Sequence, residues 1–522
     1  MNRIPPSHSR KPFWAATVVL LVVSTLLITS CREDFNFNPS TGQLAFSKDT
    51  LFLDTIFTGI SSSTYNFKVY NTSDEDILIP SVRLAEGNSS SYRLNVDGLA
   101  GQSFEDIPLL AKDSLFVFVE VTQRLDGSQP DFLLTDQILF GDGISDQTVE
   151  LVTLVRDAVF LYPERGEDGE RELVPIGTDG QGNIIALEGF LLEDDELRFT
   201  ADKPYVIYGY AAVPEDRDLV IDPGARLYFH KNSGIYVGPQ GSLQVNGALS
   251  TDVELKENAV IFEGDRLEPE WEYQSGQWGG VWLSAESRPS QMNHLILRNA
   301  SVGIFLEGGG TETTRLTLTN SQIHNSQNIG LLLRNSRAEI DNSIIGSAGI
   351  YSVYLNLGGH YQFRHCTLAN YWTAGFRNTP ALFIDNFIDL GTAGILTGDL
   401  EQANFINTII DGNRSLEFLA AASPAASFEF SLDHCLLRFN DLSQTLVNDP
   451  LYDFTSINRY RSLFLNNPAE FTEPAFEDFR LLPESGARER ARESISALLP
   501  LDLWGNTRTL PADLGALEYI PE

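Results

Sequence analysis

A short repeat between residues 316 and 410 restricts the possible folds of this chain more than any other feature. A four-residue unit that begins with Asn, His or Asp and ends in Ile or Leu returns at intervals of 22, 23, 20 and 22 residues. A fixed period of this length is typical of a solenoid. Because the apolar runs are short and lack helical periodicity, we predict a right-handed parallel β-helix with coils stacked about 4.8 Å apart. The units are Asn320-Ser321-Gln322-Ile323, Asn342-Ser343-Ile344-Ile345, His365-Cys366-Thr367-Leu368, Asp385-Asn386-Phe387-Ile388 and Asn407-Thr408-Ile409-Ile410.

The N-terminal part of the chain follows a different period. Between residues 43 and 157 apolar and polar residues alternate, and turn-forming pairs such as Asp97-Gly98 separate the runs. About seven such runs predict an antiparallel β-sandwich. This stretch shows no catalytic constellation, and we interpret it as a spacer that lifts the next domain off a membrane. One predicted strand places Leu115, Val117, Val119 and Val121 on the same face.

The coils of the β-helix begin clearly after residue 218, where four-residue apolar runs alternate with Gly or Pro-Gly. A solenoid needs a cap over its first exposed coil, and the preceding segment is the only candidate. The predicted fold class is all-β, a sandwich followed by a single-stranded right-handed parallel β-helix. The predicted segments are 1–30 as signal peptide, 31–42 as tether, 43–157 as sandwich, 158–217 as N-terminal cap and 218–522 as β-helix with a C-terminal cap.

The start of the chain has the pattern of an exported protein. Basic residues without acidic ones accompany an apolar run over residues 13–28, and small residues precede Cys31, as in a signal peptide. The string Leu27-Ile28-Thr29-Ser30-Cys31 resembles a bacterial lipobox, which implies that Cys31 carries a lipid and becomes the new N-terminus. A retained transmembrane helix is the alternative, although the run is short for a span of about 20 residues.

The residues after Cys31 indicate where the protein is located, and its net charge restricts the partners that it can bind. Arg32-Glu33-Asp34 is similar to the export signal that sends some Gram-negative lipoproteins to the outer face of the outer membrane, which implies exposure at the cell surface; the periplasmic side is the alternative. The formal net charge is −35, which repels nucleic acid and anionic head groups. We therefore expect no nucleic-acid partner. The charge also argues against an acidic polysaccharide unless Ca²⁺ bridges it to the protein.

The two other cysteines occupy the same position in their units. Cys366 and Cys435 are 69 residues apart, which corresponds to about three coils and roughly 14 Å. Because this separation exceeds the reach of a disulfide, we predict two buried free thiols. In a strand, neighbouring residues point to opposite faces, so the adjacent His365 and His434 do not complete a metal site with them.

Three further stretches resemble known families. Val69-Tyr70-Asn71-Thr72-Ser73 looks like the immunoglobulin-like modules of bacterial surface proteins. Residues 222–247 and 276–283 resemble the β-helix lipoproteins of Gram-negative surface proteomes, within the pectate-lyase-like (pectin lyase-like) superfamily. Residues 478–483 and 502–518 are similar to the tail that closes many bacterial parallel β-helices, although Glu484-Ser485-Gly486-Ala487 replaces the usual Ser-Pro-Ala. That resemblance implies that the tail caps the last coil, whose parallel edge needs cover.

Because pectate-lyase-like enzymes share the expected fold, catalysis is one interpretation. In those enzymes carboxylates on one outer face bind Ca²⁺ beside an Arg or Lys base. The acids here occupy scattered places in the period, so their convergence is not implied, and turn capping is the plainer account of Asp385. The one Asp-Asp pair, Asp194-Asp195, lies before the coils, which weakens a paired-carboxylate hydrolase. The weighed candidates are Asp385, Asp389, Asp399, Glu401 and Asp411, with Arg364 and Arg377.

Aromatic residues are the more suggestive binding candidates. Trp271, Tyr273, Trp278 and Trp282 cluster around an insertion at residues 266–277, and a second cluster follows some four coils later. Aromatic rings stack on sugar faces, and insertions on one side of a solenoid often carry binding. The alternative is that Trp278 and Trp282 pack in the coil. The candidate glycan-binding residues are Trp271, Tyr273, Tyr371 and Trp372.

The remaining polar residues suit a scaffold. Side-chain amides at one coil corner can bond one another and hold the turn, and the histidines lack ligand spacing. We therefore predict no catalytic residue, no metal site and no cofactor. The predicted function is a lipid-anchored surface protein that presents its β-helix to a glycan or a surface protein; the alternative is a surface polysaccharide lyase or glycoside hydrolase. Functional residues are expected in the interruptions at 266–277 and 413–427. The residues assigned to the scaffold are Asn320, Asn342, Asn407, His294, His324 and His360.

Overall fold

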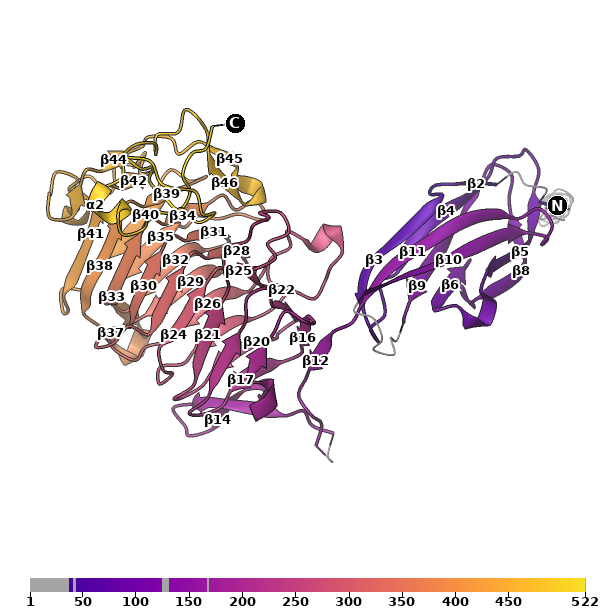
Figure 1. Cartoon of the computed structure of the whole chain (residues 1–522), viewed down its shortest axis with the longest axis horizontal. Coiled ribbons are helices and arrows are strands. Elements are labelled where there is room, and N and C mark those ends of the chain that lie inside the picture. Colours follow the sequence, from indigo (N-terminus) through magenta and orange to yellow (C-terminus); the bar gives the residue numbers. More distant parts are fainter. Residues whose placement is uncertain (1–36, 41–43, 124–130, 167–168, 522) are drawn as a thin grey trace, which may run out of the picture. The chain divides into compact units, whose positions relative to one another are not determined.

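The computed structural model describes residues 37–40, 44–123, 131–166 and 169–521. The predicted signal peptide and Cys31 lie outside the described residues. Within them, no helix has both the length and the apolar character that a membrane span requires. The chain forms two compact units that divide near residue 155, and each is described by itself (Figure 1).

The first unit is a β-sandwich, as predicted. One sheet has the order β2-β4-β9-β6-β7 and the other β1-β5-β10-β11-β3, with β8 also on β5. Strands β4 and β9, β5 and β8, and β6 and β9 pair antiparallel. The predicted alternation is confirmed, because Leu115 and Val117 are buried while Phe116 and Phe118 are exposed. The strands are β1 (Asn38–Pro39), β2 (Leu44–Phe46), β3 (Thr50–Phe57), β4 (Tyr65–Asn71), β5 (Ile77–Leu84), β6 (Tyr92–Val96), β7 (Leu99–Gly101), β8 (Ser103–Leu109), β9 (Ser114–Val121), β10 (Asp131–Gly141) and β11 (Gln147–Arg156).

The second unit is a right-handed parallel β-helix in which each coil supplies one strand to each of three sheets. We name the sheets after one coil. The β28 sheet contains β12 (Val159–Leu161), β16 (Tyr205–Ile207), β19 (Arg226–Phe229), β22 (Val260–Gly264), β25 (Leu295–Arg298), β28 (Gln322–Ser326), β31 (Ile344–Ala348), β34 (Thr367–Asn370), β39 (Ile409–Gly412), β42 (Leu436–Leu437) and β44 (Phe464–Leu465). The β29 sheet contains β13 (Leu173–Thr178), β14 (Ile184–Leu191), β17 (Tyr210–Val213), β20 (Gly234–Val237), β23 (Gly280–Leu283), β26 (Val302–Leu306), β29 (Ile329–Arg334), β32 (Tyr351–Asn356), β35 (Leu382–Asp385) and β40 (Phe418–Ala421). The β30 sheet contains β15 (Arg198–Phe199), β18 (Asp218–Ile221), β21 (Ser242–Asn246), β24 (Ser290–Asn293), β27 (Leu316–Thr319), β30 (Arg337–Asp341), β33 (Gly359–Arg364), β38 (Leu400–Ile406), β41 (Phe428–Asp433) and β43 (Tyr460–Arg461).

Stacked aliphatic side chains form the interior of the coils. Ile323 pairs in register with Ile345, which pairs with Leu368, and the column continues through Ile410 to Leu437. All five side chains are fully buried. Each coil thus covers the apolar face of its neighbour. Because every coil needs apolar residues at the same positions, the coils appear as a repeat in the sequence.

One unit of the predicted repeat is wrong. Strand β34 pairs directly with β39, whereas β36 (Phe387–Asp389) forms an antiparallel hairpin with β37 (Ile395–Thr397) outside the stack. The stretch between the units at His365 and Asn407 is therefore one long coil with two insertions. Cys366 and Cys435 consequently lie two coils apart rather than three, and both are buried and free, as predicted. The units that do form coils share a turn residue with a positive φ, between 49° and 54° at Asn320, Asn342, His365, Asn407 and His434.

The coils begin earlier than the sequence indicated. Strands β12, β14 and β15 pair parallel with β16, β17 and β18, so the segment 158–217, expected as a separate cap, already supplies coils. Its edge is covered in part by β13, which pairs antiparallel with β14. The prediction missed these coils because a charged loop and a hairpin interrupt the repeat there.

The C-terminal tail does not close the last coil. Aromatic side chains of residues 439–460 cover that end, where Phe439 packs on Tyr452 and Phe430 on Tyr460. The tail, residues 466–521, instead runs back along the outer face of the β28 sheet (Figure 1, yellow). Its elements are β45 (Phe471–Glu473), the 3₁₀ helix η6 (Pro474–Phe476), β46 (Asp478–Leu481) and α2 (Glu493–Ser496).

Polar contacts dock the tail on the coil corners. The Gly515 N–H donates to the Asn407 carbonyl at 2.8 Å, and the Arg508 guanidinium donates to Asn342 Oδ1 at 2.7 Å. His365 Nε2 accepts from Asn407 Nδ2 at 2.9 Å, while His365 Nδ1 lies 3.2 Å from the Gly515 carbonyl. Asn342 Nδ2 also donates to Asn320 Oδ1 at 2.8 Å, so amides of neighbouring coils bond one another at the corner, as predicted, and they also anchor the tail.

Candidate functional site

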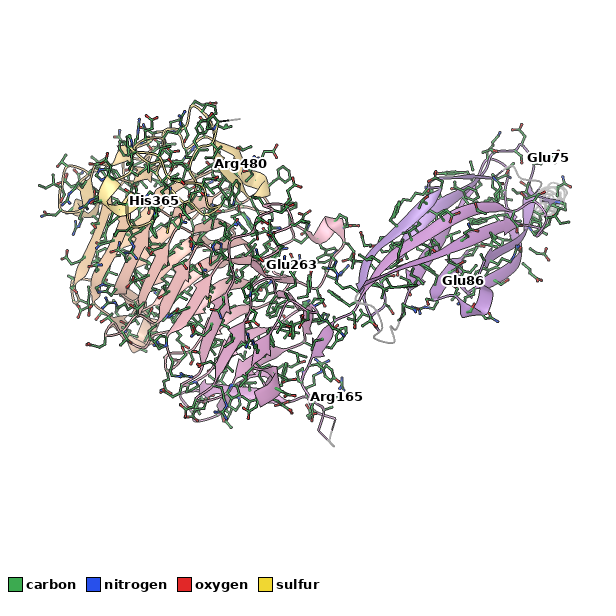
Figure 2. All side chains as sticks on the ribbon, in the orientation of Figure 1. Glu75, Glu86, Arg165, Glu263, His365 and Arg480 are labelled. Atoms are coloured by element: carbon green, nitrogen blue, oxygen red, sulfur yellow. The ribbon has the colours of Figure 1, made fainter. Side chains whose placement is uncertain are left out.

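A cavity of about 650 Å³ opens on the outer face of the β28 sheet. Its floor comes from β25 and β28. Because side chains alternate along a strand, Leu295 and Leu297 point into the coil, whereas Ile296 and Arg298 line the cavity. The loop at 248–259, the insertion at 266–277 and the tail form the walls. Figure 2 labels Glu263 on β22 and Arg480 on β46, which mark this part of the β-helix.

Three aromatic side chains from distant segments meet at the cavity. Tyr273 lies in the insertion at 266–277, shortly after the 3₁₀ helix η3 (Pro269–Trp271). Phe476 is the last residue of η6, and Trp504 lies in the last part of the tail. Tyr273 is 39% exposed and Phe476 60% exposed, and their ring centroids are 5.7 Å apart in an edge-on arrangement. Exposed rings that line a concave site present apolar faces to a ligand.

Charged side chains surround the floor of the cavity. Arg298 Nε lies 3.2 Å from Glu477 Oε2, and the Glu477 side chain is only 5% exposed. Neither carboxylate oxygen of Glu477 has a hydrogen-bond partner among the described residues. Glu477 also adopts a left-handed backbone, with φ of 67°. Lys256 lines the same cavity, and the half-buried Glu263 interacts with it electrostatically.

Burial shapes the ionisation of these groups. It raises the pKa of both Glu263 and Glu477, although Arg298 and Lys256 act in the opposite direction. Burial opposes the charge of Arg298 as well, but Glu477 and Glu263 outweigh it and hold the pKa of that guanidinium above its usual range. The pKa of Lys256 is lowered, first by burial and then by Arg298. A carboxylic acid with a raised pKa can act as a proton donor near neutral pH.

The predicted aromatic candidates separate into two groups. Tyr273 lines the cavity, and Trp271 lines an adjoining hollow of about 250 Å³, where Arg266 lies over its ring at 4.2 Å. Tyr371 and Trp372 are not brought to this site. The Tyr371 hydroxyl donates to Asp411 at 2.9 Å and its ring packs against Phe471 of the tail, while Trp372 is only 9% exposed. Both therefore serve packing, and their prediction as glycan-binding residues is not supported by their position.

The tryptophans beside the insertion also pack. Trp278 is 1% exposed, stacks on Phe229 with ring centroids 4.2 Å apart, and donates to the Arg298 carbonyl at 2.7 Å. Trp282 donates to Glu307 at 3.0 Å. These contacts match the packing interpretation of both residues.

The acids weighed for a Ca²⁺ site do not converge. Asp385 accepts from Tyr354, Asn356 and the Leu357 N–H, in agreement with turn capping. Within the described ranges, no group of three or more His, Cys, Asp or Glu side chains forms a metal-binding arrangement. The other contacts are Asp389 with the Gly391 N–H, Asp399 with Ser427, Glu401 with His360, Asp411 with Tyr371, Asp194 with Arg217, Arg364 with Asp341 and Arg377 with Glu417.

The histidines interpreted as scaffold lie in different environments. His294 lines the cavity, and burial lowers its pKa. His324 is fully buried under Phe479, whose ring is parallel to it at 5.8 Å, and burial lowers the pKa of His324 well below its usual value.

Sequence patterns missed most of the cavity. The sequence did not predict a binding role for five of its lining residues, because they stand far apart in the chain and the tail must dock on the β28 sheet before they meet. These residues are Lys256, Arg298, Phe476, Glu477 and Trp504. The one usable signal was the aromatic insertion, which pointed to Tyr273.

The described fold agrees with known β-helices. A family model described as a right handed beta helix region matches residues 225–368 and 302–436. No curated protein sequence matches the chain. Among solved structures, the catalytic domain of a GH87 α-1,3-glucanase is 9% identical over 76% of this chain and 87% of that chain, with a TM-score of 0.22. The periplasmic alginate epimerase AlgG is 9% identical over 55% of this chain and 79% of that chain, with a TM-score of 0.19. A PapD-like domain of human CEP192 is 12% identical over 30% of this chain and 97% of that chain, with a TM-score of 0.16. Similarity at this level carries no conclusion about activity.

Proposed function

We propose that this chain is a lipid-anchored protein of the bacterial cell surface that binds a glycan, without catalysis, in the cavity on the β28 sheet. The observation that carries the proposal is the meeting of Tyr273, Phe476 and Trp504 around a concave site of about 650 Å³. Ligand sites typically combine such apolar walls with a few polar groups that fix orientation. Arg298, Glu477 and Lys256 supply those groups here.

A glycan panel tests the binding proposal. We expect Tyr273→Ala and Trp504→Ala to weaken binding about tenfold or more each, which corresponds to about 1.4 kcal/mol. Tyr162→Ala is the matched control, because Tyr162 is also an exposed tyrosine, with 62% exposure, but it does not line the cavity. Equal affinities for all three variants and the unaltered protein would remove the cavity from the proposal.

The proposed location is supported by the lipobox-like string that ends at Cys31 and by the residues after it, which together suggest a surface-exposed anchor. Protease added to intact cells is the test. Cleavage of the protein without cell lysis is the expected outcome, and complete protection would place it on the periplasmic side.

Catalysis is the second candidate, favoured by one observation. The buried Glu477 carboxyl has a raised pKa and lines the cavity, as a general acid of a glycoside hydrolase would. The same panel should be followed for depolymerisation. Shortened products that disappear with Glu477→Gln would establish the enzyme, whereas binding without products supports the non-catalytic proposal.

A further inference from the structure

The Lys256 side chain is held at the cavity without a partner of its own. Its ammonium group makes no hydrogen bond or ion pair with the part of the chain that the structure describes, although the residue lines the cavity. The backbone of the turn is fixed. The Lys256 N–H donates to the Asp252 carbonyl at 3.0 Å, and the Lys256 carbonyl accepts from the Ala259 N–H at 3.1 Å and from Arg226 Nη2 at 2.7 Å.

This turn holds Lys256 in an unfavourable conformation. Its φ is 50°, in the left-handed region that is unfavourable for a residue with a Cβ. Strain of this kind collects at functional sites, where the surrounding structure maintains it. Glu477, which lines the same cavity from the tail, shares the feature with φ of 67°. Two charged residues of one cavity are thus both presented from left-handed turns.

The charges that face Lys256 leave it unpaired. They are Arg298 on the floor and the carboxyl groups of Glu263, Glu272 and Glu477. Glu477 is engaged with Arg298 at 3.2 Å, and Glu263 is half-buried. Burial and the Arg298 charge lower the pKa of Lys256 despite these acids. A lysine that is partly desolvated and lies near another cation loses its proton readily and becomes a nucleophile.

We propose that Lys256 is a nucleophilic amine that binds a carbonyl compound covalently, as an imine, at the wall of the cavity. The neutral amine attacks the carbonyl carbon, a C–N bond forms, and the carbonyl π electrons pass to oxygen, which takes up a proton. The nitrogen then loses a proton, and the hydroxyl group leaves as water after protonation from solvent, which closes the C=N bond as a protonated iminium. Loss of the second nitrogen proton to solvent gives the imine. One amine and one carbonyl group give one imine and one water, so no oxidant or reductant is consumed.

The carbonyl compound we assign is the open-chain aldehyde of a reducing sugar. This assignment rests on the proposed function, since the aromatic walls would hold the sugar while Lys256 reaches its first carbon. The reactivity of the amine itself does not depend on glycan binding. A small aldehyde and a reducing sugar therefore test the two parts separately.

The experiment treats the full chain with glycolaldehyde and sodium cyanoborohydride, which reduces an imine to a stable secondary amine, and locates the added mass by peptide mass spectrometry. A lowered pKa leaves more of a lysine side chain as the free amine at neutral pH. We expect Lys256 to be labelled faster at pH 7 than the exposed Lys48 and Lys231. The advantage should shrink as the pH rises and every lysine loses its proton.

Two variants and a second aldehyde complete the test. Lys256→Arg should abolish the fast labelling, whereas the matched Lys231→Arg should leave it unchanged. Equal labelling of Lys256 and Lys231 at pH 7 would overturn the proposal, and this result needs no variant to fold. A reducing disaccharide should label Lys256 while its borohydride-reduced form does not. Fast labelling by glycolaldehyde in a protein that binds no glycan would keep the reactive amine and overturn the proposed function.

Discussion

The ion pair between Arg377 and Glu417 allows a test of whether the interruption at residues 413–427 has a structural role or a binding role. Both side chains are essentially buried, 1% and 0% exposed, and they meet through two contacts of 2.7 and 2.9 Å. Glu417 also accepts from the backbone N–H groups of Ala381 and Arg414. The pair thus ties the insertion after β34 to the turn before β40.

Removing one partner of a buried pair leaves the other charge without compensation. We expect Arg377→Met to lower the free energy of unfolding of the β-helix by about 3–5 kcal/mol. Arg377→Met combined with Glu417→Gln removes the orphaned charge and keeps an acceptor oxygen for one of the two backbone N–H groups, which donate to different oxygens of Glu417. The double variant should therefore lose about 1–3 kcal/mol, less than Arg377→Met alone.

Urea unfolding followed by tryptophan fluorescence measures both variants. Five of the six tryptophans lie beyond residue 270, so the signal reports on the β-helix and not on the sandwich. A loss below about 1 kcal/mol for Arg377→Met, or a double variant that is less stable than the single one, would refute the reasoning. Unchanged glycan binding by folded Arg377→Met would agree with a purely structural role.

Two further predictions concern buried titratable groups. Burial holds the pKa of His365 well below the usual value of about 6.5. The contribution of the neutral imidazole to stability is therefore fully present above pH 6.5 and is lost as the pH falls below that value. Between pH 7 and 5 the melting temperature should fall more steeply for the unaltered protein than for His365→Asn, and parallel profiles would contradict this. Cys366 and Cys435 are fully buried, and burial raises the pKa of Cys435 to about 12. A thiol reagent should therefore modify neither cysteine in the native protein and both after unfolding. Fast labelling of the native protein would show that the coils open there.

The candidate site shows where pattern reading fails. Tyr273 was accessible from the sequence because it belongs to a visible interruption of the repeat. Tyr371 and Trp372 belong to an equally visible cluster, but the tail covers Tyr371 and the coil buries Trp372. The sequence pattern does not distinguish an aromatic residue whose ring is exposed at a cavity from one whose ring packs against another part of the chain.

The sequence by itself determined the class of fold. A coil buries its apolar face only against an equivalent coil, so the column from Ile323 to Leu437 repeats as a local pattern that can be read without coordinates. Alternation did the same for the sandwich, as at Leu115 and Val117. The period also predicted two free, buried thiols, although Cys366 and Cys435 lie two coils apart and not three.

Only the tertiary structure decided the course of the tail and the existence of the cavity. The tail residues Phe476 and Glu477 reach Tyr273 and Arg298 because the chain turns back along the β28 sheet instead of covering its last coil. That choice depends on contacts between distant segments, such as Arg508 with Asn342, which are 166 residues apart in the chain. Contacts at such separations leave no period in the sequence, which is why the scaffold could be predicted and the site on its wall could not.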